Sequence, residues 1–594
     1  MRRSALSRTG LQGCLALILG LCGGAITAQA VPVSRQDPEA PSNSTKPVST
    51  ASGAAVVVTG HPHASAAALA ALQAGGHAID ALVAAQAVLA VVEPQSSGLG
   101  GGGFLLHWNA QLGQLEVLDG RETAPQRSRP SDFLNAEGEA LPWLQATSSL
   151  QAIGIPGTVA LLWEAHLQHG RRPWSDLLDQ AITLARDGFE PSPRLLRSIA
   201  LAQRLGGDHN LAFQQLYLPD GAVIRPGERL RNPALARTLE RLAHHGGHDF
   251  YRGKLSRQIL QELTELSREE ARFRGWSAAD LASYKVMRRQ PLCSPWRDHL
   301  LCSVPAPSSG GLAVQQSLAL WDALSRLDKI AQPSNWQRLA QALAWADADR
   351  LYWVRDPLDG VPWVSALLDP AYISARARRM KGDLSLRAAP GLPPGQPSYP
   401  FARPAGGRED GTSQITIVDA EGNLVSYTAS VETVFGSRHL VAGMVMNNQL
   451  TDFSFRPSIG GEPVANQRRP GRRPMSSMAP TIVFRDGRPL LATGSPGGRR
   501  IPHFLSRTLL AALVWQEPPH RAVALPHLSV NDGVLVLERE APLPWPVAPE
   551  QLAIQGQDVR FQRFGSGTAL LQRINGRWHG AADPRREGKA MALP

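Results

Sequence analysis

The 594-residue sequence has few cysteines, few aromatic residues and few long apolar runs. Two of its four cysteines lie within the first 30 residues, which leaves too few for a cysteine-ligated metal site. After residue 30 no run approaches the ~18 apolar residues of a transmembrane helix. The sequence contains neither G-x-S-x-G nor H-E-x-x-H, which argues against a serine hydrolase and a zinc protease. The net charge is +11, but no basic stripe with interleaved aromatics favours a nucleic-acid partner.

Apolar residues make up 43% of the chain and charged residues 19%, which predicts a large packed core. Residues 1–30 combine three arginines, a short apolar run and the small-x-small sequence Ala28-Gln29-Ala30. This pattern is typical of a signal peptide and predicts an exported protein, periplasmic or secreted. A lipoprotein anchor at Cys22 is the alternative, although Leu21 is large where that signal needs a small residue.

The other two cysteines, Cys293 and Cys302, flank a segment that predicts strand, turn and strand, with Pro295 at the turn. In an exported protein this spacing favours a hairpin disulfide. Two free thiols in neighbouring strands are the alternative.

The chain divides into a helix-rich first part and a strand-rich second part. Residues 31–54 are polar and predict a flexible segment, residues 55–411 are mostly helical, and their Pro/Gly-rich end at 387–411 predicts a mobile linker. At Thr412 a clear strand hairpin begins, and residues 412–594 continue with strands. A strand that starts directly after a loose linker is expected where a nucleophile becomes a new N-terminus.

An N-terminal threonine can act without a histidine or an aspartate. Its own α-amine, with a pKa of about 8, can accept the hydroxyl proton at neutral pH. The chemistry requires scission just before the threonine, which favours a small preceding residue and a rigid strand after it. Gly411 and Thr412 meet this requirement.

Long motifs in the same order resemble those of the γ-glutamyltranspeptidase (γ-glutamyltransferase) family from about residue 55 to the C-terminus. They are Gly75–Phe104, Asp119-GRETAP, Ile155-PGTVA, Pro305-APSSGG, Thr412-SQITIVDAEGNLVSYTAS, Asn447-NQLTDFS, Arg473-PMSSMAPTIV, Thr493-GSPGG and Gly580-AADPRREG. The resemblance implies a precursor that cleaves itself between Gly411 and Thr412 into a large (55–411) and a small (412–594) subunit. It also implies an α+β fold, the four-layer αββα sandwich of N-terminal-nucleophile hydrolases, and no cofactor.

The resemblance implies a role for each matched residue. The catalytic set is Thr412 as nucleophile, Ser430 as the hydroxyl that orients it, and the backbone N–H groups of Gly497 and Gly498 as oxyanion donors. The substrate-binding set is Arg121, Ser476 and Ser477 for the α-carboxylate, and Asp452, Gln449 and Glu432 for the ammonium group.

Each residue also has an ordinary structural explanation, such as an Arg121–Glu122 pair, a capping Asp452 or a plain Gly-Gly turn. Two positions depart from the commoner family pattern, where Ser430 is usually threonine and Glu432 usually asparagine.

The implied substrates are glutathione or other γ-glutamyl compounds, with water, an amino acid or a peptide as acceptor. Family members with a lid over the pocket usually have a longer segment here that carries an aromatic gate, whereas the segment from Asp452 to Ser476 is short and has no tyrosine. This difference from the family implies an open pocket that admits bulkier donors. A glutaryl or cephalosporin-type amide acylase on the same scaffold is therefore one alternative. A catalytically inactive periplasmic binding protein is another.

Two sequence features could suggest dinucleotide or metal binding, but their context favours neither. Gly98–Gly103 matches the dinucleotide pattern G-x-G-x-x-G, but a helix precedes it and a strand follows, the reverse of what that fingerprint needs. We interpret these glycines as allowing close backbone approach near the active site. The histidines at 61, 63, 244, 245 and 248 are interpreted as turn or loop residues, so no metal ligand is predicted.

Overall fold

The computed structural model describes residues 47–594 except 271, 325–328, 360–363, 383–384, 395–410 and 554–556. The predicted signal peptide and most of the predicted linker at 387–411 lie outside the described residues.

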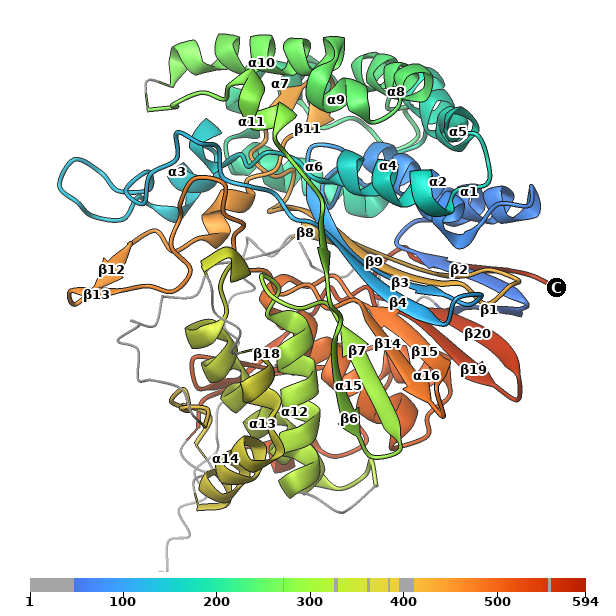
Figure 1. The fold of residues 1–594 in the computed structure, drawn as a ribbon, viewed down its shortest axis with the longest axis vertical. Coiled ribbons are helices and arrows are strands. Elements are labelled where there is room, and N and C mark those ends of the chain that lie inside the picture. Colours follow the sequence, from blue (N-terminus) through green and yellow to red (C-terminus); the bar gives the residue numbers. More distant parts are fainter. Residues whose placement is uncertain are drawn as a thin grey trace, which may run out of the picture. The chain divides into compact units, whose positions relative to one another are not determined.

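Two seven-stranded antiparallel sheets form the centre of the described chain (Figure 1). The first sheet has the order β21 (Lys589–Leu593), β2 (Ala55–Thr59), β8 (Gly411–Val418), β9 (Leu424–Glu432), β3 (Gly102–Asn109), β4 (Gln114–Gly120) and β5 (Met287–Arg289). The second has the order β1 (Ser49–Gly53), β20 (Arg577–Ala582), β19 (Ala569–Ile574), β15 (Arg488–Gly494), β14 (Thr481–Arg485), β7 (His299–Ser303) and β6 (Leu292–Trp296). Both sheets therefore combine strands from before and after Gly411.

The two sheets pack on each other through β2, β8 and β9 of the first sheet and β15, β19 and β20 of the second. Side chains alternate between the two faces of a strand, so strand β2 of the first sheet contributes residues to two hydrophobic cores. Val57 belongs to the core beneath the helices, whereas Val56 and Val58 belong to the core between the sheets. The run of apolar residues from Ala55 to Val58 in this strand follows from burial on both faces.

Helices cover the first sheet on the face away from the second (Figure 1). Helix α2 (Ala78–Val92), buried along its whole length, contacts β8, β9 and three neighbouring helices. The helices of this part are α1 (Pro62–Gln73), α3 (Trp143–Thr147), α4 (Thr158–His169), α5 (Trp174–Asp187), α6 (Pro193–Arg204), α7 (Leu211–Tyr217), α8 (Pro233–His245), α9 (His248–Arg252), α10 (Lys254–Leu266) and α11 (Ala278–Ala282). Among the described helices, none combines the length and apolar character needed to cross a bilayer.

A second group of helices packs beside the second sheet, where α12 contacts β6 and β7 and α16 contacts β19 and β20. This group contains α12 (Gly310–Leu324), α13 (Pro333–Trp353), α14 (Pro370–Gly382), α15 (Ile501–Leu513) and α16 (Pro519–Ala524). The small sheets are β10 (Leu440–Val441) with β11 (Met444–Val445), β12 (Ser458–Ile459) with β13 (Glu462–Pro463), and β16 (Leu528–Asn531), β17 (Val534–Glu538) and β18 (Val559–Gln562). The chain is thus α+β with antiparallel sheets.

Two local expectations differ from the structure. Residues 49–53, within the segment predicted to be flexible, form β1 because they pair with β20 near the C-terminus, a partner over 500 residues away. Pro295 lies inside β6, and the turn follows it at Arg297, which has a φ of 54°. A proline is tolerated there because β6 is an edge strand. Cys293 and Cys302 face each other across β6 and β7 and form a disulfide.

The glycine run at 98–103 brings β3 against β9, in agreement with the interpretation of close backbone approach. A Cβ atom on Gly101 would lie 2.2 Å from the carbonyl oxygen of Ser430. A Cβ atom on Gly98 would meet only a methyl group of Ala90, at 4.0 Å. Two glycines of one motif therefore differ sharply in what they tolerate.

Gly101→Ala is expected to destabilise the protein by about 1–3 kcal/mol, because the new methyl group forces β9 away from β3. Thermal unfolding of the variant checks this, with Gly98→Ala as the matched control that keeps the wild-type melting temperature. Equal melting temperatures for both variants would contradict the packing described here.

Candidate active site

Thr412 is the second residue of β8 and is 3% exposed. It lies opposite Ser430 of β9, and the pairing shifts by one residue between Gly411 and Thr412. This bulge places Gly411 opposite Glu432. The Gly411–Thr412 peptide therefore lies at an irregularity at the very start of a buried strand.

The carbonyl group of Gly411 is held by Ser430, whose hydroxyl donates a hydrogen bond to it. The same hydroxyl accepts a bond from the backbone N–H of Glu432, at 2.8 Å. A Cβ atom on residue 411 would lie 2.8–3.0 Å from three backbone oxygens, those of Glu432, Thr433 and Gln95. Only glycine fits there, and its carbonyl is already polarised by a hydroxyl.

Glu432 has a φ of 84°, a backbone conformation that costs a non-glycine residue about 1–3 kcal/mol. Its side chain is buried. Burial lowers the pKa of the neighbouring Arg438 to about 10, and the charge of Glu432 opposes that shift. The structure thus places Glu432 beside the Gly411 carbonyl through its backbone.

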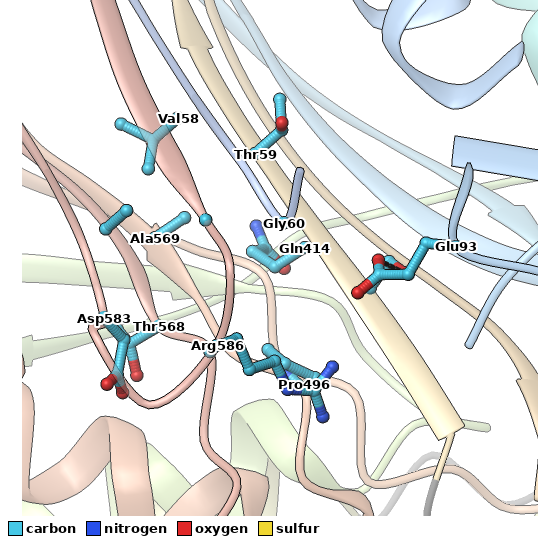
Figure 2. A pocket seen from close by; sticks show the side chains of 14 residues that line it. Val58, Thr59, Gly60, Glu93, Gln414, Pro496, Thr568, Ala569, Asp583 and Arg586 are labelled. Atoms are coloured by element: carbon cyan, nitrogen blue, oxygen red, sulfur yellow. Dashed lines mark hydrogen bonds between the residues drawn. The ribbon is translucent and has the colours of Figure 1, made fainter. Parts of the chain in front are cut away.

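Charged side chains contact the backbone at Thr412 and the residue after it. Arg586 donates a hydrogen bond of 2.8 Å to the carbonyl oxygen of Thr412. The next residue, Ser413, donates to Glu93 at 2.6 Å, and Glu93 is paired with Arg194 at the same distance. Figure 2 shows Glu93 and Arg586 among the side chains that line a cavity of about 10 Å³. These contacts fix the backbone at Thr412 and Ser413.

Arg121 and Asp452 form a buried ion pair, with Nη2 of the arginine 2.5 Å from Oδ2 of the aspartate. Gln449 donates to the same carboxylate oxygen at 2.6 Å. Arg121 is fully buried and also donates to the backbone oxygens of Pro474 and Met475. It follows β4, whose last residue Gly120 lies opposite Gly103 of β3. Since Gly102 lies opposite Ser430, the pair is at the same end of the sheet as Thr412.

Glu122 is the second acid beside Arg121, with Oε2 at 3.7 Å from Nη1. Burial raises the pKa of Glu122 to about 7. Its carboxyl group is therefore about half protonated at neutral pH, and Asp452 is the closer partner of the arginine. The Arg121–Glu122 pair considered from the sequence exists, but at the longer distance.

Ser476 and Ser477 lie directly after the backbone that Arg121 contacts. The carbonyl of Ser476 accepts bonds from the backbone N–H and the hydroxyl of Ser309. The hydroxyl of Ser477 accepts from Arg350 at 2.8 Å. Arg350 also donates to the carbonyl of Arg499, at 3.0 Å. This arginine therefore ties the serine pair to the loop that contains Gly497 and Gly498.

Gly497 and Gly498 precede α15 and have φ angles of 134° and 54°. A Cβ atom on Gly497 would lie 2.4 Å from the ring of Phe504. Glycine is needed here because both the conformation and the space exclude a side chain. Backbone N–H groups at a helix start attract negative charge.

Arg586 and Arg350 were not predicted as site residues. Arg586 lies in the segment Gly580-AADPRREG, which the sequence analysis identified. That motif gave no indication of the contact between Arg586 and Thr412. Arg350 lies on α13 with no distinctive pattern around it, and only the fold brings it to Ser477.

The gamma-glutamyltranspeptidase family model matches residues 64–593. The chain belongs to the γ-glutamyltranspeptidase family. The resemblance drawn from the sequence motifs is confirmed, and with it the prediction of an enzyme of this family.

Two proteins similar to this chain carry different names. A glutathione hydrolase proenzyme of Bacillus subtilis (strain 168) is 32% identical over 91% of this chain and 91% of its own. Acylase ACY 1 proenzyme of Pseudomonas sp. (strain SE83) is 31% identical over 92% of this chain and 95% of its own. A crystal structure of cephalosporin acylase from Bacillus halodurans has the same fold, with a TM-score of 0.79, 23% identity, and coverage of 96% of this chain and 99% of that one.

Ser430→Ala is expected to slow precursor cleavage by about 10²–10³-fold, because the Gly411 carbonyl loses the hydroxyl that would stabilise its developing negative charge. The time course of conversion to two fragments, followed by gel electrophoresis, measures this. Ser430→Thr keeps a hydroxyl and is the control, expected to cleave. An alanine variant that cleaves as fast as wild type would contradict a role for this contact.

Proposed function

We propose that the protein is a self-processing γ-glutamyltransferase and glutathione hydrolase, with Thr412 as its nucleophile. The observation that carries the proposal is the buried Arg121–Asp452 pair at the same end of the sheet as Thr412. A γ-glutamyl donor ends in an α-carboxylate and an α-ammonium on one carbon. A neighbouring cation and anion are complementary to that zwitterion.

In the complex, the substrate carboxylate would take the place of Asp452 on the Arg121 guanidinium, and the ammonium would pair with Asp452 and Gln449. Ser476 and Ser477 would add hydrogen bonds to the carboxylate, and Glu432 would add negative charge on the ammonium side. A glutaryl group has the carboxylate but no ammonium. It would leave Asp452 buried without a cationic partner, which is costly. The pair therefore favours γ-glutamyl over glutaryl donors.

Catalysis would begin once Thr412 has a free α-amine. The hydroxyl attacks the γ-carbonyl carbon while its proton passes to the amine, and the N–H groups of Gly497 and Gly498 stabilise the oxyanion. The C–N bond then breaks, the leaving amine takes the proton, and a γ-glutamyl ester remains on Thr412. Water releases glutamate, whereas an amino acid or peptide acceptor yields a new γ-glutamyl compound.

The same proposal covers processing and location. Scission between Gly411 and Thr412 would give subunits 55–411 and 412–594, which together form the four-layer αββα sandwich of the N-terminal-nucleophile type. Residues 1–30 would direct export to the periplasm or the medium. The helices and antiparallel sheets of the described chain and the word "proenzyme" in the names of its relatives support this arrangement.

Thr412→Ala should abolish both cleavage and turnover, because it removes the one hydroxyl that both reactions use. The wild-type protein should give a small fragment whose N-terminal residue is Thr412, as determined by N-terminal sequencing. A small fragment beginning elsewhere would show that the nucleophile is misassigned.

Asp452→Asn should lower kcat/KM for a γ-glutamyl anilide by about 10–100-fold, since a charge-assisted contact of about 1.5–3 kcal/mol is lost. Hydrolysis of a glutaryl anilide should become faster, because the neutral amide removes the cost of leaving a buried carboxylate without a cationic partner. Steady-state kinetics with both anilides on the processed enzyme checks the split. An equal loss with both donors would mean that Asp452 acts on the fold and not on the ammonium.

A further inference from the structure

A second cluster of polar side chains lies on the first sheet, away from Thr412. His107 of β3 and Glu116 of β4 are direct cross-strand partners, and His169 is the last residue of α4. His107 lies opposite Val425 of β9, five residues along β3 from Gly102, which is opposite Ser430. Five residues of a strand span about 16 Å, so the cluster is separate from the nucleophile.

The three side chains converge on one point. Nδ1 of His107 lies 2.7 Å and Nε2 of His169 lies 2.5 Å from Oε1 of Glu116. One nitrogen or oxygen of each residue can be chosen so that all three atoms lie within 4.8 Å of one another. The other carboxylate oxygen of Glu116 accepts a bond of 3.1 Å from Arg288, which orients the carboxylate.

His107 is fully buried, and its Nε2 has no hydrogen-bond partner among the described residues. Such an atom is uncommon in a folded protein. Glu116 and His169 are the two ligands with solvent access, with side chains 24% and 16% exposed. The cluster is therefore buried on the side of His107 and open to water on the side of Glu116 and His169.

We propose that His107, Glu116 and His169 form a binding site for one divalent transition-metal ion of the zinc class. Two imidazole nitrogens and one carboxylate oxygen match the ligand preferences of Zn²⁺ and its neighbours Co²⁺ and Ni²⁺, and not those of Mg²⁺ or Ca²⁺. Water would complete a tetrahedral site from the exposed side.

Binding requires a rearrangement of the three side chains. Around Zn²⁺, with bonds of about 2.0 Å, tetrahedral ligand atoms stand about 3.3 Å apart. The present contacts to Glu116 are shorter, so its carboxylate must move outward by less than about 1 Å, which its partial exposure allows. The two histidine nitrogens lie within 4.8 Å of each other and must approach by up to about 1.5 Å.

The groups around the cluster leave it open to a cation. His77 packs edge-on against His107, with ring centroids 5.3 Å apart. The Nδ1 atom of His77 already caps α2, so this ring packs beside the site without joining it. Arg288 is the nearest cation to Glu116, but its side chain is 46% exposed and water screens its charge.

A bound ion would tie the β3–β4 hairpin to the end of α4. Because the folded chain binds the ion and the unfolded chain lacks the assembled site, binding should raise thermal stability. It should leave turnover at Thr412 unchanged, since the site is remote from the nucleophile.

The test uses the processed, untagged enzyme after treatment with a chelator. Equilibrium dialysis against Zn²⁺ should give one tightly bound ion per chain and a higher melting temperature. Co²⁺ in place of Zn²⁺ should give visible absorption bands typical of four-coordinate cobalt. His169→Ala and Glu116→Gln should each weaken binding by at least tenfold and abolish the stabilisation, while anilide turnover shows that both variants are folded.

The matched control is the double variant His244→Ala/His245→Ala, which removes two exposed histidines elsewhere in the chain. It should bind zinc as the wild type does. The proposal is overturned if the wild type binds no ion, if His169→Ala still binds it with wild-type affinity, or if the His244/His245 variant loses it.

Discussion

The antiparallel pairing of β8 with β9 is the constraint on which the rest of the site depends. It puts Ser430 opposite Thr412, and the one-residue shift next to it turns the carbonyl of Gly411 toward the Ser430 hydroxyl. The same sheet continues through β3 to β4, which ends just before Arg121. One hydrogen-bonded register therefore sets the positions of Thr412, Ser430 and Arg121 together.

Electrostatics then determines what this end of the sheet can bind. Arg121 and Asp452 neutralise each other at 2.5 Å in a buried position, which avoids an isolated charge in the free protein. A ligand that brings both charges exchanges this pair for two new ones. A ligand with only one charge would leave one residue unpaired, and under the proposed function that difference would favour α-amino acid ends.

Local sequence was enough to predict the elements with strong patterns. The strand hairpin predicted to begin at Thr412 is formed by β8 and β9. The alternation of side chains along a strand acts within a few residues, so no tertiary information was needed. Strand β1 escaped prediction because its partner β20 is distant in the chain and its own sequence is polar.

The site shows the same division. The residues predicted for it came from motifs, and the structure shows contacts among several of them, such as Arg121 with Asp452 and Ser430 with Gly411. Arg350 and the trio His107, Glu116 and His169 belong to no such motif, and the motif that contains Arg586 does not reveal its contact with Thr412. A single histidine or arginine carries no local pattern that distinguishes a ligand from a surface residue.

The interleaving of strands has a consequence for the cut chain. In the first sheet β2 lies between β21 and β8, and in the second sheet β14 lies beside β7, so strands from both sides of Gly411 share their ladders. Separating two fragments after scission would break main-chain hydrogen bonds at several seams and open both cores to water. Hydrolysis of the peptide would thus create two new termini without releasing a subunit, and the two pieces would remain a single folding unit.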